Sequence, residues 1–210
     1  MLCRFTQRHT YGWESNPSVV SNSGGPQACS RIGLQDSGLI AEDQREKLTP
    51  VSLLRLNIKQ SNTSVSKKGS VRGIHYALVP PSQAKYVQCQ KGSIIDYVID
   101  IRVGSPTFSQ FVEVELSATN PQAIFIEEGL AHAFVALEDE TVVTYFVSEN
   151  YNPEREKGIN PFDSDLNIKW PDINLELSEK DELAISLKEA QVQNLLPMFD
   201  ECKKFIKSLN

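Results

Sequence analysis

Apolar and polar residues alternate in short runs through the middle of the chain. Between Ser93 and Ile101, one face of an extended strand would carry Ile95, Tyr97, Ile99 and Ile101, and the other Ile94, Asp96, Val98 and Asp100. The same alternation predicts strands at 85–90, 111–116, 123–126, 133–137 and 141–148. These strands recur about every ten residues with no helix-length pattern between them, which favours an antiparallel sandwich or barrel.

Helical patterns are confined to the end of the chain. Ser178 to Asp181 is typical of a capping box, and it predicts a helix that continues to about Gln193. Pro197 permits a second helix, whose apolar stripe would consist of Phe199, Cys202, Phe205 and Ile206. The fold class is therefore expected to be mainly β with C-terminal helices.

Local composition and periodicity divide the chain into three parts. Residues 1–32 are rich in turn and linker residues, without periodicity, and we expect a flexible N-terminal segment. Residues 33–177 would form the barrel domain, although 33–56 is ambiguous and the clear strand pattern starts near residue 56. Residues 178–210 would form helices that pack on the barrel.

The composition narrows the class of protein. The chain has 210 residues, of which 40% are hydrophobic, and this is enough for one folded domain with a full core. The net charge of −6 and the lack of a basic cluster argue against a nucleic-acid partner, but not against a nucleotide ligand. The sequence has no run of 18 apolar residues that would indicate a membrane span. No glycine-rich dinucleotide or P-loop motif is present either.

The four cysteines Cys3, Cys29, Cys89 and Cys202 have neither a zinc-like nor a disulfide-framework spacing. Reduced thiols are typical of a cytoplasmic protein, and the first residues lack the apolar stretch of a signal peptide. We therefore expect a cytoplasmic location.

The three histidines are the scarcest candidates for chemistry. His75 follows Arg72 by three residues, which puts a possible base near an anion-binding guanidinium. His132 follows the Gly129 turn and can point into the mouth of a barrel. Each histidine taken alone favours a structural role, and their similar placement at strand entries supports a functional role about equally well.

A metal centre would be one use of two barrel histidines. Metal-binding cupins have a second histidine two residues after the first, and position 77 is Ala here. Asp96, His132 and Glu138 could be recruited, but their spacing is not a recognisable ligand set. We therefore expect no metal.

Three further residues have a structural and a catalytic interpretation. Tyr145 lies in a strand, where tyrosine is common as part of the core. Lys85 begins a strand, where lysine is usually solvated, but a lysine directed into a cavity could stabilise an oxyanion. Asp181 is explained by its place in the capping box without any role in catalysis.

Collinear motifs over about 56–190 resemble the dTDP-4-dehydrorhamnose 3,5-epimerase family. The resemblance begins with 60–69 and with Arg72-Gly73-Ile74-His75-Tyr76, and it continues through Gln83-Ala84-Lys85 and 100–108. It goes on through 129–134, 151–159 and 168–171. This resemblance implies a cupin-like jelly-roll β-barrel, a homodimer, no cofactor, and a dTDP-4-keto-6-deoxyhexose as substrate.

The resemblance also implies roles for individual residues. His75 matches the family's base, Asp181 the residue that orients it, Tyr145 the acid on the opposite face and Lys85 the group near the C4 oxygen. His132 matches a further active-site histidine. The substrate-binding candidates are Arg72 for the diphosphate, Gln60, Asn62 and Tyr151 for the nucleotide, and Asp96.

The chain departs from the family near its N-terminus and in its substrate-side motifs. The family's Asp-x-Arg-Gly-type motif corresponds best to Gln35-Asp36-Ser37-Gly38, with Ser37 at the arginine position. Residues 76–81 and Ala133 look more like relatives that act on modified or amino deoxysugars, some of which epimerise one carbon only. The alternatives left open are a mono-epimerase, a catalytically impaired sugar-nucleotide-binding barrel and a metal cupin.

Overall fold

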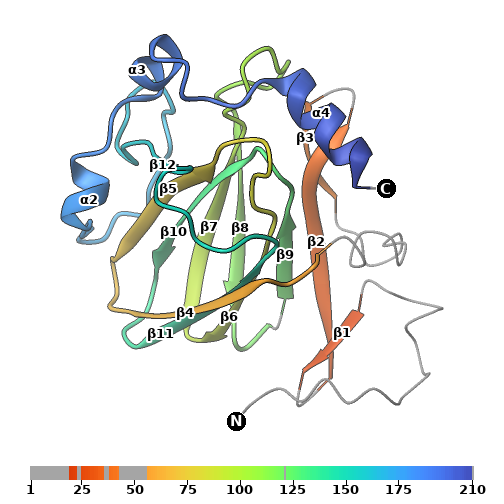
Figure 1. The fold of residues 1–210 in the computed structure, drawn as a ribbon. Helices are drawn as coiled ribbons and strands as arrows, with labels where there is room; N and C mark the ends of the chain where they lie inside the picture. The colour runs from red at the N-terminus through yellow and green to blue at the C-terminus, as the bar shows by residue number, and fades with distance from the viewer. Residues whose placement is uncertain (1–18, 23–24, 36–37, 43–55, 121, 210) are drawn as a thin grey trace.

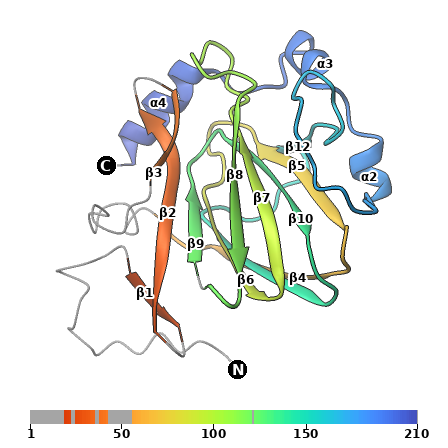
Figure 2. The same cartoon turned by 180° about the vertical axis from the view of Figure 1, so that it is seen from behind.

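The computed structural model describes residues 19–22, 25–35, 38–42, 56–120 and 122–209, and for 19–42 it describes the backbone only. Within these ranges, two sheets face each other (Figures 1 and 2). The first sheet has the order β1-β2-β9-β6-β11-β4, and β3 pairs with β2. Its strands are β1 (Val19–Asn22), β2 (Gly25–Gln35), β3 (Gly38–Glu42), β4 (Gln60–Ser66), β6 (Lys85–Lys91), β9 (Gln122–Ile126) and β11 (Thr141–Val147).

The second sheet has the order β12-β5-β10-β7-β8. Its strands are β5 (Val71–Ala77), β7 (Ser93–Ile99), β8 (Phe111–Ser117), β10 (Ala131–Ala136) and β12 (Glu156–Gly158). All described neighbours are antiparallel except β2 and β9, which are parallel. The prediction of a mainly β fold with C-terminal helices is confirmed.

The space between the two sheets is filled by an apolar core to which both sheets contribute. Its members include Val87 of β6, Ile94 and Val98 of β7, Phe134 of β10 and Val143 of β11. Burial of this apolar surface from both sides holds the sheets together as a barrel.

A second core covers the outer face of the β5–β10–β7 sheet. Tyr97 and Ile99 of β7 pack there with residues of the C-terminal part of the chain, including Ile159, Leu187 and Leu196. In Figure 1, α2 (Glu179–Glu182) and α3 (Leu187–Val192) lie on the side of β5 and β12, whereas α4 (Phe199–Ser208) lies on the opposite side. The C-terminal layer thus covers the outer face of this sheet, and α2 contacts β5, the strand that carries His75.

The predicted strands at 85–90, 93–101, 111–116, 123–126, 133–137 and 141–148 are confirmed within one or two residues. The alternation did not predict β4, β5 or β12, nor β1–β3 in the N-terminal part. The flexibility expected for residues 1–32 stays a prediction: 1–18 and 23–24 lie outside the described residues, and the remainder forms β1 and most of β2. The proposed motif correspondence at Asp36 and Ser37 also lies outside them.

The prediction of one helix from 178 to about 193 is wrong, because α2 and α3 are separate. Ser186 begins α3 with its own capping box, since its hydroxyl accepts from Glu189 N and the Glu189 carboxylate accepts from Ser186 N. Ile185 is held in an extended bridge with Ile159, which interrupts the helix. The predicted stripe of α4 is confirmed, and Phe199, Cys202 and Ile206 are buried. No helix among the described residues is long and apolar enough to cross a membrane.

Candidate active site

His75 and Asp181 form the first pair of the candidate site. His75 lies on β5 and Asp181 in α2, and the distance from His75 Nε2 to Asp181 Oδ1 is 2.7 Å. The side chain of Asp181 is 6% exposed and that of His75 is 36% exposed. An anionic carboxylate can only accept a hydrogen bond, so the proton lies on Nε2 of His75. This leaves Nδ1 as the basic nitrogen.

The electrostatics of Asp181 favour its carboxylate. Burial by itself would raise the pKa of Asp181, but the hydrogen bond and charge of His75, with help from Ser178 and the Gly73 N–H, lower it below the usual value. The Ser178 hydroxyl accepts from Asp181 N, which is the predicted first half of a capping box. Asp181 therefore caps α2 through its backbone and contacts His75 through its side chain.

Close approach of two strands explains the glycine before His75. Gly73 has a φ of +119°, and a Cβ at this position would lie 2.6 Å from the Cβ of Ala133 on β10. Only glycine fits this conformation and this spacing without displacement of the neighbouring strand. The register shift between β5 and β10 occurs here, next to His75.

The second pair is His132 and Asp96, which belong to the barrel interior. His132 lies directly opposite His75 in the β10–β5 ladder. Its Nδ1 is 3.5 Å from Asp96 Oδ1, and the two side chains are 8% and 0% exposed. Burial raises the pKa of Asp96 and lowers that of His132, so the neutral forms of both are favoured.

These buried atoms lack hydrogen bonds. Both carboxylate oxygens of Asp96, and Nδ1 of His132, have no hydrogen-bond partner among the described residues. An unsatisfied buried polar group costs about 1–3 kcal/mol and is typically found where a protein binds or transforms a ligand. Glu138, the third member of the metal set considered from the sequence, instead accepts from the Ser93 hydroxyl near the surface.

Tyr145 and Lys85 come from the opposite sheet. Tyr145 on β11 packs against His132, with a ring-centroid distance of 6.4 Å. Burial, with Glu156, raises the pKa of Tyr145, so its phenol is protonated near neutral pH. Lys85 at the start of β6 is only 6% exposed, so it is not the solvated lysine that is usual at a strand start. Burial lowers the pKa of Lys85 to about 8, against the opposing charges of Glu156, Asp96 and Glu128.

Four polar residues continue the site along β4, β5 and the loop that carries Tyr151. Asn62 lies opposite Tyr145 in the β4–β11 ladder. Its side-chain oxygen accepts from Gln60 Nε2 at 2.7 Å, and Gln60 Oε1 accepts from Tyr151 N at 2.9 Å. Arg72 is exposed on β5, and its Nε donates to the Ser66 hydroxyl at 2.9 Å.

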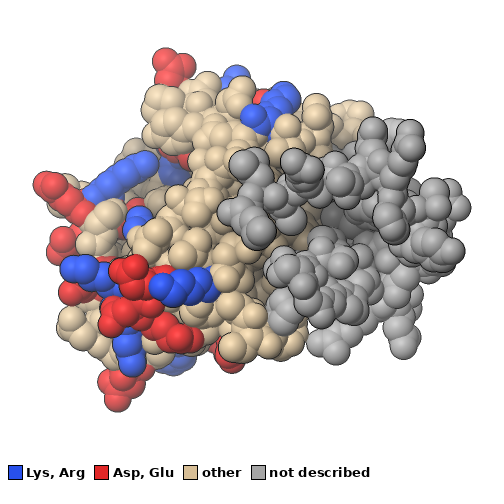
Figure 3. Space-filling model, turned by 90° about the horizontal axis from the view of Figure 1, so that it is seen from below, with Lys and Arg blue, Asp and Glu red and all other residues tan. Residues whose placement is uncertain are grey.

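The ten predicted site residues therefore come from the two facing sheets and the segments next to them. The second sheet and the C-terminal layer supply His75, Asp181, His132, Asp96 and Arg72. The first sheet and its loops supply Tyr145, Lys85, Gln60, Asn62 and Tyr151. On the face shown in Figure 3, basic and acidic side chains are interspersed at one side, and a largely uncharged surface borders the undescribed residues. No continuous basic patch is seen on the described part of that face.

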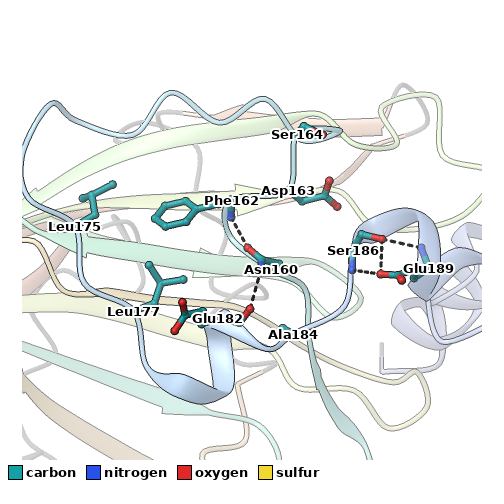
Figure 4. A pocket seen from close by; sticks show the side chains of 10 residues that line it. All are labelled: Asn160, Phe162, Asp163, Ser164, Leu175, Leu177, Glu182, Ala184, Ser186 and Glu189. Atoms are coloured by element: carbon teal, nitrogen blue, oxygen red, sulfur yellow. Dashed lines mark hydrogen bonds between the residues drawn. The ribbon is translucent and has the colours of Figure 1, made fainter.

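Two hollows lie next to the candidate active site. A groove of about 690 Å³ lies between α2, α3 and residues 160–164 of the C-terminal layer, and Figure 4 shows Phe162, Leu177 and Glu182 at its wall. Its Asp163 and Glu189 carboxylates accept backbone N–H groups and serve the local fold. A hollow of about 210 Å³ is lined by residues 77–83 and 149–156, including Tyr151, and so adjoins the site.

Among the described residues, no group of three or more His, Cys, Asp or Glu side chains could hold a metal ion. The prediction that the site works without metal or cofactor is not tested by this finding. Sequence reasoning missed Glu156, whose charge acts on both Lys85 and Tyr145. Its only sequence signal was its place inside the 151–159 motif.

Comparisons with known proteins agree with this geometry. Residues 34–189 match the family model described as dTDP-4-dehydrorhamnose 3,5-epimerase. The chain is 47% identical over 156 residues to the dTDP-4-dehydrorhamnose 3,5-epimerase of Mycolicibacterium smegmatis, with 74% of this chain and 77% of the relative covered. It is 43% identical over 148 residues to a dTDP-4-dehydrorhamnose 3-epimerase of Streptomyces niveus, with 70% and 72% covered.

Solved structures give the same result. The rmlC epimerase of Mycobacterium tuberculosis superposes with a TM-score of 0.74 at 39% identity, covering 86% of this chain and 92% of that one. ChmJ, a 3'-monoepimerase from Streptomyces bikiniensis in complex with dTDP-quinovose, also superposes with a TM-score of 0.74, at 35% identity and the same coverage.

Proposed function

The chain belongs to the dTDP-4-dehydrorhamnose 3,5-epimerase family, and on this premise we propose that it epimerises C3, C5 or both of a dTDP-4-keto-6-deoxyhexose, without a cofactor, in deoxysugar biosynthesis. One observation carries the proposal: His75 comes from one sheet of the barrel, and Tyr145 comes from the sheet that faces it. Inversion of a carbon next to a ketone requires a base on one side and an acid on the other.

In the proposed reaction, His75 removes the proton from the carbon next to the C4 ketone. The electron pair of the broken C–H bond moves toward the C4 oxygen and forms an enolate. The Asp181 carboxylate, 2.7 Å from Nε2, fixes the tautomer and stabilises the imidazolium that forms. Its lowered pKa supports this role, because the group is ionised at neutral pH.

Tyr145 returns a proton to the opposite face of the same carbon. Its raised pKa supports this role, because the phenol holds its proton until the enolate needs it. Lys85 stabilises the negative charge that develops on the C4 oxygen, and burial makes this interaction stronger than it would be in water. Proton exchange with solvent restores His75 and Tyr145 after each turnover.

We place the rest of the substrate along β4 and β5. Arg72 binds the diphosphate, and Gln60, Asn62 and Tyr151 bind the nucleotide. The support is that the Gln60 side chain links the Asn62 side chain to the Tyr151 backbone N–H in one polar row next to Tyr145. The buried carboxylate of Asp96, which lies 3.5 Å from His132, and His132 itself supply hydrogen-bonding groups for the sugar.

The experiment that tests the proposal is proton exchange in heavy water. The protein is incubated with dTDP-4-keto-6-deoxyglucose, and NMR measures deuterium at C3 and at C5 separately. Deuterium at one or both carbons is expected, and His75→Ala is expected to abolish it. Binding of dTDP without exchange at either carbon would instead indicate an impaired binding barrel.

The assay also decides which carbon reacts. Some relatives are named 3,5-epimerases and others 3-epimerases, so family membership alone leaves C5 open. Deuterium at C3 alone would identify a mono-epimerase, and deuterium at both carbons a 3,5-epimerase. Resistance of the activity to a chelator would support the cofactor-free mechanism, whereas loss restored by a divalent metal would overturn it.

We also propose that the working unit is a homodimer in the cytoplasm. The support is the family resemblance over residues 34–189, which covers the barrel domain. Light scattering of the purified chain at micromolar concentration is expected to give twice the chain mass. A monomer with full epimerase activity would overturn this part of the proposal.

A further inference from the structure

Asp181 belongs to a helix that has little packing of its own. α2 consists of four residues, and Asp181 is the one among them that is buried. The next residue after α2, Leu183, is 75% exposed, and Glu182 and Ala184 line the groove of about 690 Å³. A single helical turn is marginal in water and is stabilised by its surroundings. The position of Asp181 therefore depends on the hydrogen bonds that join α2 to the rest of the protein.

Segment 158–160 joins the strand of His75 to the chain that follows α2. Ile159 N donates to Ile74 O at 3.0 Å, and Ile74 N donates to Ile159 O at 3.2 Å. Ile159 is fully buried and forms a parallel bridge with Ile185, three residues beyond the end of α2. The segment is thus fixed to β5 on one side and to the chain after α2 on the other.

The Asn160 side chain extends this connection to α2 itself. Its Nδ2 donates to Glu182 O at 2.9 Å, and its Oδ1 accepts from Phe162 N at 2.8 Å (Figure 4). The last carbonyls of a helix have no partner inside the helix, and Glu182 O is one of them. Asn160 therefore provides a hydrogen bond to the end of α2, one residue after Asp181.

We propose that Asn160 is a positioning residue of the candidate active site, whose amide holds the C-terminal end of α2 and thereby keeps the Asp181 carboxylate within hydrogen-bond distance of His75. The distance between that carboxylate and Nε2 of His75 is 2.7 Å. A hydrogen bond weakens steeply when its angle departs from the preferred range, so a small displacement of α2 would weaken this contact. The catalytic consequence rests on the proposed function, whereas the contact of Asn160 with α2 does not.

Two substitutions of Asn160 remove the contact with α2 and keep the contact with Phe162. Asn160→Asp keeps the oxygen that accepts from Phe162 N and replaces the donor to Glu182 O by a second oxygen. Asn160→Ser also keeps an acceptor for the turn but is too short to reach Glu182 O. It introduces no charge, and so it covers the case in which Asn160→Asp does not fold.

The contact with α2 is tested by amide hydrogen exchange of the full chain, followed by NMR without substrate. The amides of Glu182 and Leu183 donate to carbonyls at the start of α2. In both variants these amides are expected to exchange about 3- to 10-fold faster, as for the loss of one hydrogen bond. The amide of Ile74 on β5 is expected to keep its rate, because its own hydrogen bond to Ile159 O is unchanged.

Asn167→Asp is the matched control. Asn167 is an exposed asparagine of the same C-terminal layer, and its Oδ1 accepts from Lys169 Nζ at 2.8 Å. A carboxylate can accept in the same way, so the substitution changes the same chemical group without removal of a donor contact. This variant is expected to leave the α2 amide rates and the rate of substrate proton exchange unchanged.

The role in the reaction is tested by a double-variant cycle on substrate proton exchange in heavy water. Asn160→Asp is expected to lower kcat about 3- to 10-fold and to leave KM within about twofold, because it affects the base and not substrate binding. In an Asp181→Ala background the same substitution is expected to have no further effect on kcat, since no carboxylate is left to position. A general loss of structure would instead lower kcat by the same factor in both backgrounds.

The outcomes separate this proposal from the proposed function. Unchanged α2 amide rates in both Asn160 variants overturn the contact with α2. Faster α2 amides in a chain whose parent exchanges no substrate protons support the contact and overturn the proposed function. Faster α2 amides with an unchanged kcat, or with equal losses of kcat in the two backgrounds, overturn the positioning role of Asn160.

Discussion

Replacement of Asp181 by Asn tests the centre of the proposed mechanism. The amide has nearly the same shape as the carboxylate and can still accept a hydrogen bond from His75 Nε2. It carries no charge, however, and so it cannot stabilise the imidazolium that forms when His75 takes a proton. The variant should therefore bind substrate normally and remove the substrate proton slowly.

The contact geometry sets the expected size of the effect. A hydrogen bond to a charged group contributes about 1.5–3 kcal/mol, and each 1.36 kcal/mol corresponds to about tenfold in rate. The 2.7 Å distance and the 6% exposure of Asp181 favour a large contribution, whereas the 36% exposure of His75 favours a smaller one, so we use the whole range. We expect kcat for exchange to fall between about 10-fold and 150-fold, less than the loss of about 10⁴ for the analogous change in a Ser-His-Asp triad.

The assay is the initial rate of deuterium incorporation into substrate in heavy water, measured by NMR at saturating and at limiting substrate. Asp165→Asn is the matched control, because Asp165 is an exposed aspartate of the same C-terminal layer. It should retain the parent rate. If Asp181→Asn keeps kcat within about threefold of the parent, Asp181 does not assist the base, and the mechanism is wrong.

Other substitutions test separate parts of the structure. Tyr145→Phe should still exchange protons but invert the carbon about 10²–10⁴-fold more slowly, as chiral analysis of the product would reveal. Because the folded-state pKa of Asp181 is lowered, its stabilisation is present above its unfolded pKa and is lost as the pH falls through the folded value. Urea unfolding of Asp181→Asn should therefore lack this acid-dependent loss; an unchanged pH slope would contradict it. Asp100→Asn should cost about 3–5 kcal/mol in urea unfolding, because Asp100 and Arg102 form a fully buried pair at 2.7 Å; a loss below about 1 kcal/mol would contradict this.

The strands between 85 and 148 could be predicted because each is bounded by turns and has either an apolar repeat of two or, as at 123–126 and 133–136, a short apolar run. β7 is the clearest case, since its two faces serve two different cores. Tyr97 and Ile99 pack under the C-terminal layer, while Ile94 and Val98 pack inside the barrel. The sequence shows that both faces of β7 are apolar. It does not show which part of the chain covers the outer face.

The apolar pattern did not predict β4, because the inner face of this strand is polar. Its inward positions are Gln60, Asn62, Ser64 and Ser66, and its outward positions include the exposed Val65. The polarity of this strand is thus the reverse of what a core strand shows, because its inner face lines the candidate site instead of the apolar core. A search for apolar alternation cannot detect such a strand.

The site itself could be proposed from family motifs but not from local pattern, and the reason is distance along the chain. His75 and Asp181 are 106 residues apart and meet only because α2 packs against β5. Lysine is usually solvated at a strand start, whereas Lys85 is buried. The charge of Glu156 raises its pKa against the effect of burial, and Glu156 lies on β12, a strand of three residues that is too short to predict. Local sequence therefore gives each site residue an ordinary explanation, and the chemistry arises only when the two sheets bring the residues to one place. For this reason the exchange rate in Asp181→Asn tests a contact that no local pattern contains.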